Sequence, residues 1–142
     1  MTNLIPGIQS TTAALTAERT RLDVIAQNIS NANTTRGLDG KAYRRQLVVF
    51  ESALNEAQAG RGGVAMSGPR VSHIVKDNSP LRTLFDPNHP HADSTGVVRY
   101  PNVSVHEEMA DLIAAGRTFE ANLAVLKTGK QMTMQSLSIG RR

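Results

Sequence analysis

Residues 104–126, SVHEEMADLIAAGRTFEANLAVL, decide the fold of this chain. Apolar or small residues recur there at alternating intervals of four and three, which is the spacing of a helix that packs along another helix. Ser104 and Glu107 match a capping box, and Glu107 and Glu108 place negative charge at the positive end of the helix dipole. The pattern predicts a helix that reaches Gly140. Its seam positions are Val105, Met109, Leu112, Gly116, Phe119, Leu123 and Leu126, with Leu137 after the polar Lys130 and Thr133.

A second long helix is predicted near the amino end, from Ile5 to Ala32. The residues expected to face the other helix occur every seven positions and form two sets along one seam. The first set is Ile8, Leu15, Leu22 and Ile29, and the second is Ile25 and Ala32. The Asn-rich run at residues 28–35 favours a helix end, because short polar side chains compete for backbone groups. At about 1.5 Å per residue, the first helix would be roughly 40 Å long and the last roughly 50 Å.

The predicted helices carry more apolar surface than one pairing can cover. On the last helix Ala110, Ala114, Ala121 and Val125 form a second line beside the seam. A long helix covers only one stripe of its partner, and nothing else in the chain is expected to be long enough to bury the second. Alanine could occur there merely as a good helix former. We favour the alternative, in which this second stripe packs against another subunit.

The predicted fold class is α+β, with both long helices paired as a coiled coil around a small, irregular β-rich module. The chain is expected to divide into three regions: the first helix at residues 1–36, an extended segment with the β-rich module at residues 37–100, and the last helix at residues 101–142. In the middle region β-prone segments are separated by Gly and Pro. The expected strands are Arg45 to Phe50, Val64 to Met66, Val71 to Lys76 and Gly96 to Tyr100, with a short helix through Ser52 to Gln58 as an option after the first strand.

Composition excludes several classes of protein. The 142 residues contain no cysteine, so neither a disulfide nor a thiolate metal site can form. The net charge is +4, but the basic residues are dispersed and aromatics make up only 4%, which argues against a nucleic-acid partner. The amino end lacks the features of a cleaved signal peptide, and no apolar run approaches the roughly 20 residues needed to span a membrane.

No catalytic, metal or cofactor site is expected. The most suggestive cluster is Asp86, His89, His91 and Asp93, whose side chains are of metal-binding types. The intervening prolines predict a stiff exposed loop in which Asp and Asn make local turn bonds, so the four side chains are not expected to converge. The remaining histidines and serines are scattered and suggest no triad.

Several segments together resemble the flagellar rod and hook proteins. The stretch LDVIAQNISNANTT (22–35) resembles the amino-terminal signature of that family. Three further segments are similar to its proximal-rod members: YRRQLVVFE (43–51), VKDNSPLRTLFDPNHPHAD (75–93) and GVVRYPNVSVHEEMADLIAAGRTFEANLAVLKTGKQM (96–132). Another rod or hook component is the main alternative. A basic helical protein that binds nucleic acid is a more distant one.

This resemblance implies a structural subunit of the proximal rod in the flagellar basal body. Members pair their terminal helices as a coiled coil in the inner tube of the rod. They are exported without a cleaved signal by the flagellar type III apparatus. They assemble in the periplasm with copies of themselves and other rod proteins into a helical tube that transmits torque and conducts export substrates.

The resemblance also assigns roles to individual residues. Those matching the Asn-rich helix end are expected to cap the first helix and fix the turn that follows: Asn28, Asn31, Asn33 and Thr34. Phe119 is expected to be a seam anchor. Polar residues of the last helix are expected to contact another helix or subunit: Glu107, Glu108, Arg117, Glu120 and Asn122.

Overall fold

The computed structural model describes residues 4–52 and 68–139 of the 142-residue chain. Two long helices, α1 (Leu4–Ser30) and α3 (Val105–Ile139), enclose the strands in chain order. The strands are β1 (Gln46–Ser52), β2 (Pro69–Lys76), β3 (Arg82–Phe85) and β4 (Val97–Tyr100). The predicted α+β class and the two terminal helices are therefore confirmed.

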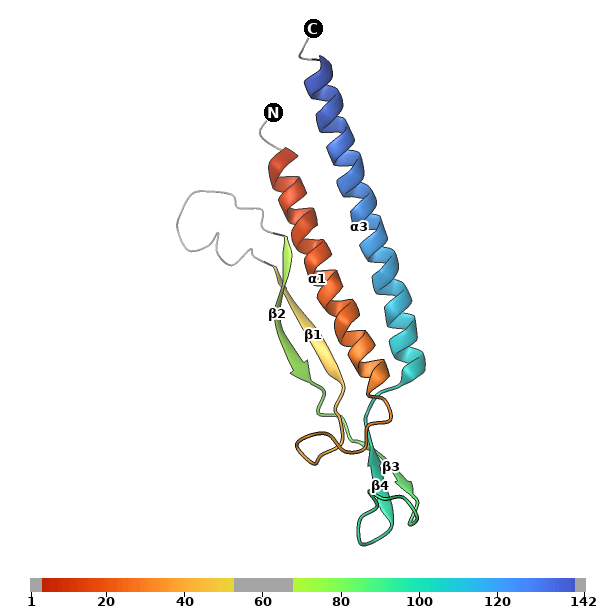
Figure 1. Ribbon diagram of the computed structural model, residues 1–142. Coiled ribbons are helices and arrows are strands. Elements are labelled where there is room, and N and C mark those ends of the chain that lie inside the picture. Colours follow the sequence, from red (N-terminus) through yellow and green to blue (C-terminus); the bar gives the residue numbers. More distant parts are fainter. Residues whose placement is uncertain (1–3, 53–67, 140–142) are drawn as a thin grey trace, which may run out of the picture.

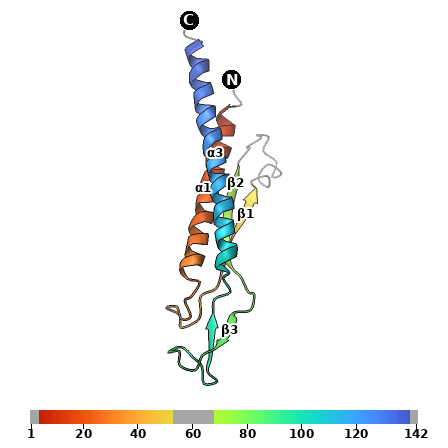
Figure 2. The same ribbon diagram turned by 90° about the vertical axis from the view of Figure 1, so that its right-hand side faces the viewer.

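The helices lie side by side and run in opposite directions (Figure 1). The β1–β2 hairpin lies along the other side of α1, and the β3–β4 ribbon lies beyond the helix ends where α1 stops and α3 begins. We call this end of the helix pair its base. Figure 2, turned by a quarter, shows α3 in front of α1 and confirms the elongated shape. At its far end α3 extends past the first described turn of α1.

The middle region forms two separate two-stranded antiparallel sheets, whereas one small module was predicted. In the first sheet the register runs from Gln46↔Lys76 to Ser52↔Pro69, with an irregularity between Val49 and Phe50. The second sheet pairs Arg82 with Tyr100 and Phe85 with Val97. The predictions of β1, β2 and β4 are confirmed. The predicted strand at residues 64–66 and the optional short helix beyond Ser52 lie outside the described residues.

One expectation about burial is wrong for α1. Its second face is covered within the chain, because the β1–β2 hairpin packs against it. Ala17 and Val24 are buried as a result, and Gly68 lies so close that a Cβ there would be 2.5 Å from the carbonyl oxygen of Ser10. On α3 the second stripe is exposed at all four positions: Ala110, Ala114, Ala121 and Val125.

The loop at residues 86–96 has the local turns that the sequence predicted. The Asn88 amide donates to Asp86 Oδ1 over 3.2 Å, and the Thr95 amide donates to Asp93 Oδ1 over 2.9 Å. Hydrogen bonds from Thr95 and Val97 lower the pKa of the Asp93 carboxyl. Gly96 has a φ of 75°, in the left-handed region that glycine adopts without strain. The loop is therefore held by hydrogen bonds among its own residues.

Few side chains are buried, and they extend from the middle of α1 past its end to β4. Among the described residues the buried apolar side chains are Ala17, Val24, Ile25, Ala32, Val98 and Ala115. Two polar side chains, Asn28 and Glu108, are buried among them, each 1% exposed. A buried amide and a buried carboxylate are costly without partners, so their surroundings form the candidate site.

Candidate functional site at the base of the helix pair

Asn28 connects α1 to both β1 and α3. Its Nδ2 donates to the Gln46 carbonyl oxygen over 2.9 Å and to Glu108 Oε2 over 3.0 Å. Its Oδ1 accepts from the Tyr43 hydroxyl and from the Gln46 amide, each at 2.9 Å. An asparagine amide has two donors and two acceptor lone pairs, so all four are used. The side chain thus bonds the backbone of Gln46 as a neighbouring strand would.

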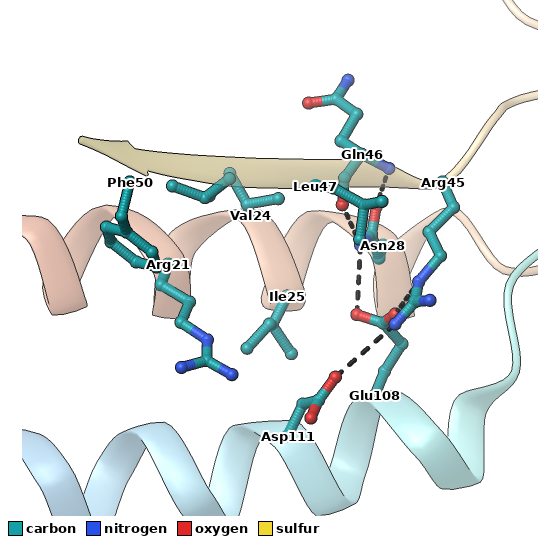
Figure 3. A pocket seen from close by; sticks show the side chains of 11 residues that line it. Arg21, Val24, Ile25, Asn28, Arg45, Gln46, Leu47, Phe50, Glu108 and Asp111 are labelled. Carbon is teal, nitrogen blue, oxygen red and sulfur yellow. Dashed lines mark hydrogen bonds and ion pairs between the residues drawn. The ribbon is translucent and has the colours of Figure 1, made fainter. Parts of the chain in front are cut away.

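Glu108 is held between Asn28 and Arg45. Arg45 Nε donates to Glu108 Oε1 over 2.5 Å, and the same guanidinium lies 3.5 Å from Asp111 Oδ2. Figure 3 shows the contacts from Asn28 and Arg45 converging on the Glu108 carboxylate. The pair joins α3 to the start of β1 and leaves Glu108 without an uncompensated charge. Removing one partner of such a pair usually costs more than the pair itself contributes.

Tyr43 and Asn102 extend the cluster to the neighbouring loops. Burial, with a smaller contribution from the negative charge of Glu108, raises the pKa of the Tyr43 phenol above 10.0. The phenol therefore remains a hydrogen-bond donor to Asn28. Asn102 Oδ1 accepts from the Arg45 amide over 2.9 Å, and its Nδ2 donates to the Asp77 carbonyl oxygen over 3.3 Å. We call Asn28, Tyr43, Arg45, Asn102 and Glu108 the polar junction.

The end of α1 places these groups beside one another. The Asn31 amide and its Nδ2 both donate to the Gln27 carbonyl oxygen, over 3.0 and 2.9 Å. The Thr34 amide then donates to the Asn31 carbonyl oxygen, and the Thr34 hydroxyl to Asn31 Oδ1. These bonds close the helix and turn the chain back, so that residues 43–46 return alongside Asn28.

The Asn-rich motif therefore divides into different roles. Asn31 and Thr34 complete the turn that the sequence assigned to the motif as a whole. Asn28 differs, because its side chain crosses to β1 and α3 rather than capping its own helix. Asn33 is exposed, and no hydrogen bond joins its side chain to another described residue.

On α3 the predicted residues separate into a buried and an exposed set. Glu108, expected to contact another helix or subunit, is bonded within the chain to Asn28 of α1 and to Arg45. Glu107, Arg117 and Glu120 are exposed, and Asn122 is half-buried. Among the described residues, no hydrogen bond joins the Ser104 hydroxyl to the Glu107 amide or the Glu107 carboxylate to the Ser104 amide, so the predicted capping box is not formed. The Ser104 carbonyl oxygen accepts the first hydrogen bond of the helix, from the Glu108 amide.

The seam residues show a similar division. On α1, Ile25 is buried and the others are half-buried: Ile8, Leu15, Leu22 and Ile29. On α3, Phe119, Leu123 and Leu126 are half-buried, but Leu112 is 37% and Met109 49% exposed. Met109 is turned outward because Glu108 and Ala115 occupy the side facing α1 near the base. The predicted seam is thus rotated slightly from the observed contact.

A pocket of about 310 Å³ opens beside the polar junction, between β1 and α3. Val24 and Ile25 contribute apolar walls, and Phe50 and Arg21 lie at the end away from Arg45, with the Arg21 side chain directed toward α3 (Figure 3). Within residues 4–52 and 68–139, no three His, Cys, Asp or Glu side chains are grouped as metal ligands. The His-rich loop instead places His91 Nδ1 2.8 Å from the Thr35 hydroxyl. The polar junction joins α1, α3 and the start of β1 through hydrogen bonds and the Arg45–Glu108 ion pair.

Sequence reasoning missed Tyr43, Arg45 and Asn102 as members of this cluster. Their partners lie far away along the chain, with Arg45 bonded to Glu108 across 63 residues. The only signals were that Tyr43 and Arg45 fall within one of the segments resembling rod proteins and Asn102 within another.

Comparisons with known proteins find similarity over most of the chain. A family described as Flagella basal body rod protein matches residues 8–36, and one described as Flagellar basal body rod FlgEFG protein C-terminal matches residues 94–139. Three similar proteins are each called flagellar basal-body rod protein FlgC. That of Yersinia enterocolitica is 42% identical, covering 91% of this chain and 92% of its own. That of Borreliella burgdorferi is 40% identical, covering 96% of this chain and 97% of its own. That of Bacillus subtilis is 39% identical, covering 91% of this chain and 93% of its own.

Proposed function

Since the chain belongs to the FlgC family of flagellar basal-body rod proteins and is a structural subunit of that rod, we propose that its exposed helical surface is completed by neighbouring subunits in a helical tube. The neighbours are copies of the chain and other rod proteins. In this tube α1 and α3 pair as a coiled coil, torque is transmitted along the wall, and export substrates pass through the lumen. Family membership decides between the alternatives that the sequence left open.

The observation that carries this proposal is the apolar surface of α3. Of the fourteen large apolar side chains that are exposed in the described residues, eight lie on this helix. They are Met109, Leu112, Ile113, Val125, Met132, Met134, Leu137 and Ile139. Large exposed apolar patches typically mark interfaces. At about 25 cal/mol per Å² of apolar surface, covering a few hundred Å² contributes several kcal/mol before ordering costs.

The polar junction supports the mechanical part of the proposal. It joins α1, α3 and β1 through buried hydrogen bonds and one ion pair. Sliding one helix along the other would separate these groups and leave a buried carboxylate without partners, which is strongly unfavourable. We assign the junction the role of fixing the helices and hairpin in one register, so that the subunit responds to load as a single body.

Export and the place of assembly belong to the same proposal. The chain acts in the flagellar basal body. We propose that it is passed through the flagellar type III apparatus without a cleaved signal and assembles in the periplasm. Neither α1 nor α3, over its described residues, is long and apolar enough to cross a membrane.

The test is a charge placed on the exposed face of α3. Val125 is 59% exposed, so Val125→Asp should leave the free chain folded. The same charge should prevent packing against a neighbour and abolish swimming in a strain that lacks its own FlgC-family gene. Gln131→Asp is the matched control, because Gln131 is an exposed polar residue of the same helix. Normal swimming with a stably expressed Val125→Asp chain would refute the proposal.

A further inference from the structure

One apolar side chain is displayed away from the rest of the molecule. Leu38 has a relative exposure of 111%, the highest of the large apolar side chains in the described residues. It lies at the tip of a loop formed by residues 34–43, which we call the Leu38 loop. Figure 1 shows this loop projecting sideways from the base, away from α3. The Leu38 side chain therefore gains no stabilisation from burial within the free chain.

The Leu38 loop is held in shape by its own backbone. The Gly37 amide donates to the Lys41 carbonyl oxygen over 2.8 Å, and the Tyr43 amide to the Thr34 carbonyl oxygen over 3.1 Å. The Gly40 amide closes the tip by donating to Gly37 over 3.0 Å, and Gly40 has a φ of 73°. Such a turn favours glycine, since other residues rarely adopt this conformation. A loop ordered before binding loses little entropy on binding.

An open pocket with both apolar and polar lining residues lies where α3 begins. We call it the base pocket, and its volume of about 440 Å³ is within the range of about 300–1,000 Å³ for ligand sites. Its apolar lining consists of Ala32, Pro80, Pro101, Val103 and Val105. The lining includes the first turn of α3, which the Leu38 loop points away from.

The charges around the two features are complementary. Asp39 follows Leu38 directly in the loop, and Arg82 and His106 line the base pocket. Lys41, on the other side of the tip, is exposed, as is Glu107, which follows His106 at the start of α3. The acidic Asp39 and basic Lys41 of the loop are thus matched by the basic Arg82 and His106 of the pocket and the acidic Glu107 beside it.

We propose that Leu38 of one copy inserts into the base pocket of a second copy of this chain. This inference rests on the proposed function and adds a particular contact to it. The loop and the pocket are different surfaces, so each copy donates a leucine to one neighbour and receives one from another. A contact of this heterologous kind does not close on itself unless the rotation closes a ring, and it generates helical assemblies.

Cysteine cross-linking tests the contact directly, because the natural chain has no cysteine. Full-length Leu38→Cys and Val103→Cys chains, mixed under oxidising conditions, should form a disulfide-linked dimer that contains one of each. Leu38→Cys mixed with Ser72→Cys is the control, since Ser72 is exposed on β2 away from the pocket. Equal yields in the two mixtures would overturn the inference. So would cross-linking of Leu38→Cys, in cells, only to a different rod protein.

Sedimentation of the purified chains gives an independent measurement. Leu38→Ala should weaken self-association by about tenfold or more, because the anchor of the contact loses most of its apolar surface. Leu47→Ala removes an exposed leucine of β1 outside the base pocket and should leave self-association unchanged. If Leu38→Ala chains associate as the natural chain does, and Val125→Asp still abolishes swimming, the contact is refuted while the rod function stands. If Val125→Asp has no effect either, the proposed function itself fails.

Discussion

Replacing Asn28 by alanine tests the polar junction most severely. The substitution removes an amide that makes four hydrogen bonds in a position that is 1% exposed. Both backbone groups of Gln46, the Tyr43 hydroxyl and the Glu108 carboxylate each lose a partner. Arg45 continues to neutralise Glu108, so the ion pair itself survives.

The expected loss of unfolding free energy can be estimated from these contacts. Three of the bonds join neutral groups, at about 1 kcal/mol each, and the bond to the Glu108 carboxylate contributes about 2 kcal/mol. The sum of about 5 kcal/mol is an upper value, because the adjoining pocket of about 310 Å³ lets water reach some of the freed groups. We therefore expect Asn28→Ala to cost about 3–4 kcal/mol, which is large for one substitution.

Urea unfolding, followed by circular dichroism, measures the global effect. Amide hydrogen exchange at Gln46 measures the local one, because this amide donates to Asn28 in the natural chain. Asn33→Ala is the matched control. It removes an exposed asparagine from the same Asn-rich motif and should change the unfolding free energy by no more than about 0.5 kcal/mol.

Similar effects of the two substitutions would refute the reasoning. An Asn28→Ala chain as stable as Asn33→Ala, with unchanged protection of Gln46, would mean that the junction contributes nothing to the fold. Equally large losses from both would mean that the Asn-rich turn matters as a whole rather than through the bonds of Asn28.

Two further predictions concern pH and packing. Because the pKa of Tyr43 is raised in the folded chain, the unfolded chain releases the phenol proton at a lower pH than the folded chain does. The stability that Tyr43 contributes is therefore complete below pH 10.0 and is lost as the pH rises through the pKa of the folded chain. Tyr43→Phe should cost about 1 kcal/mol near neutral pH and flatten the fall in stability above pH 10.0. Gly68→Ala should cost about 1–3 kcal/mol in urea unfolding, since its Cβ would be 2.5 Å from the Ser10 carbonyl oxygen. Gly129→Ala is the matched substitution, because a Cβ added at this helical position would meet nothing within 4 Å. It should raise the unfolding free energy by up to about 1 kcal/mol. A loss of stability from Gly129→Ala would contradict this account of packing.

The spacing of apolar residues was sufficient to predict both helices. The observed α3 begins at Val105, directly after the predicted cap at Ser104, and α1 ends at Ser30 within the predicted Asn-rich run. Four-three spacing is a local property, so a single sequence reveals it. Spacing defines less well which side of α3 faces α1. Glu108 is predicted to be an exposed acid from sequence alone, because its partner Arg45 is brought beside it only by the fold.

The strands were predicted less completely for a related reason. β3 has only four residues, all of them exposed, so it has no alternation of buried and exposed positions to detect. The separation into two ribbons was also missed. Gly68 packs against Ser10 across 58 positions of sequence, and no local pattern indicates that the hairpin would cover α1 rather than join the other strands.

The polar junction could be anticipated only in part. The Asn-rich motif was recognised by its composition, and Asn31 and Thr34 act locally as such residues usually do. The contacts of Asn28 are with residues 18 and 80 positions away, which local turn chemistry does not predict. Buried polar groups select their partners through the tertiary fold, and this is where the sequence was least informative.

The central claim is that neighbouring subunits complete the outer surface of α3. Amide hydrogen exchange of the free chain and of the assembled rod tests it most directly. In the free chain, we expect fast exchange in the last turns of α3, where Met134, Leu137 and Ile139 are exposed, and slow exchange beside the polar junction. In the rod, the last turns should become as protected as the junction. Equal, strong protection of the whole of α3 in both states would contradict the claim, because the free chain would then need no neighbour to order its helices.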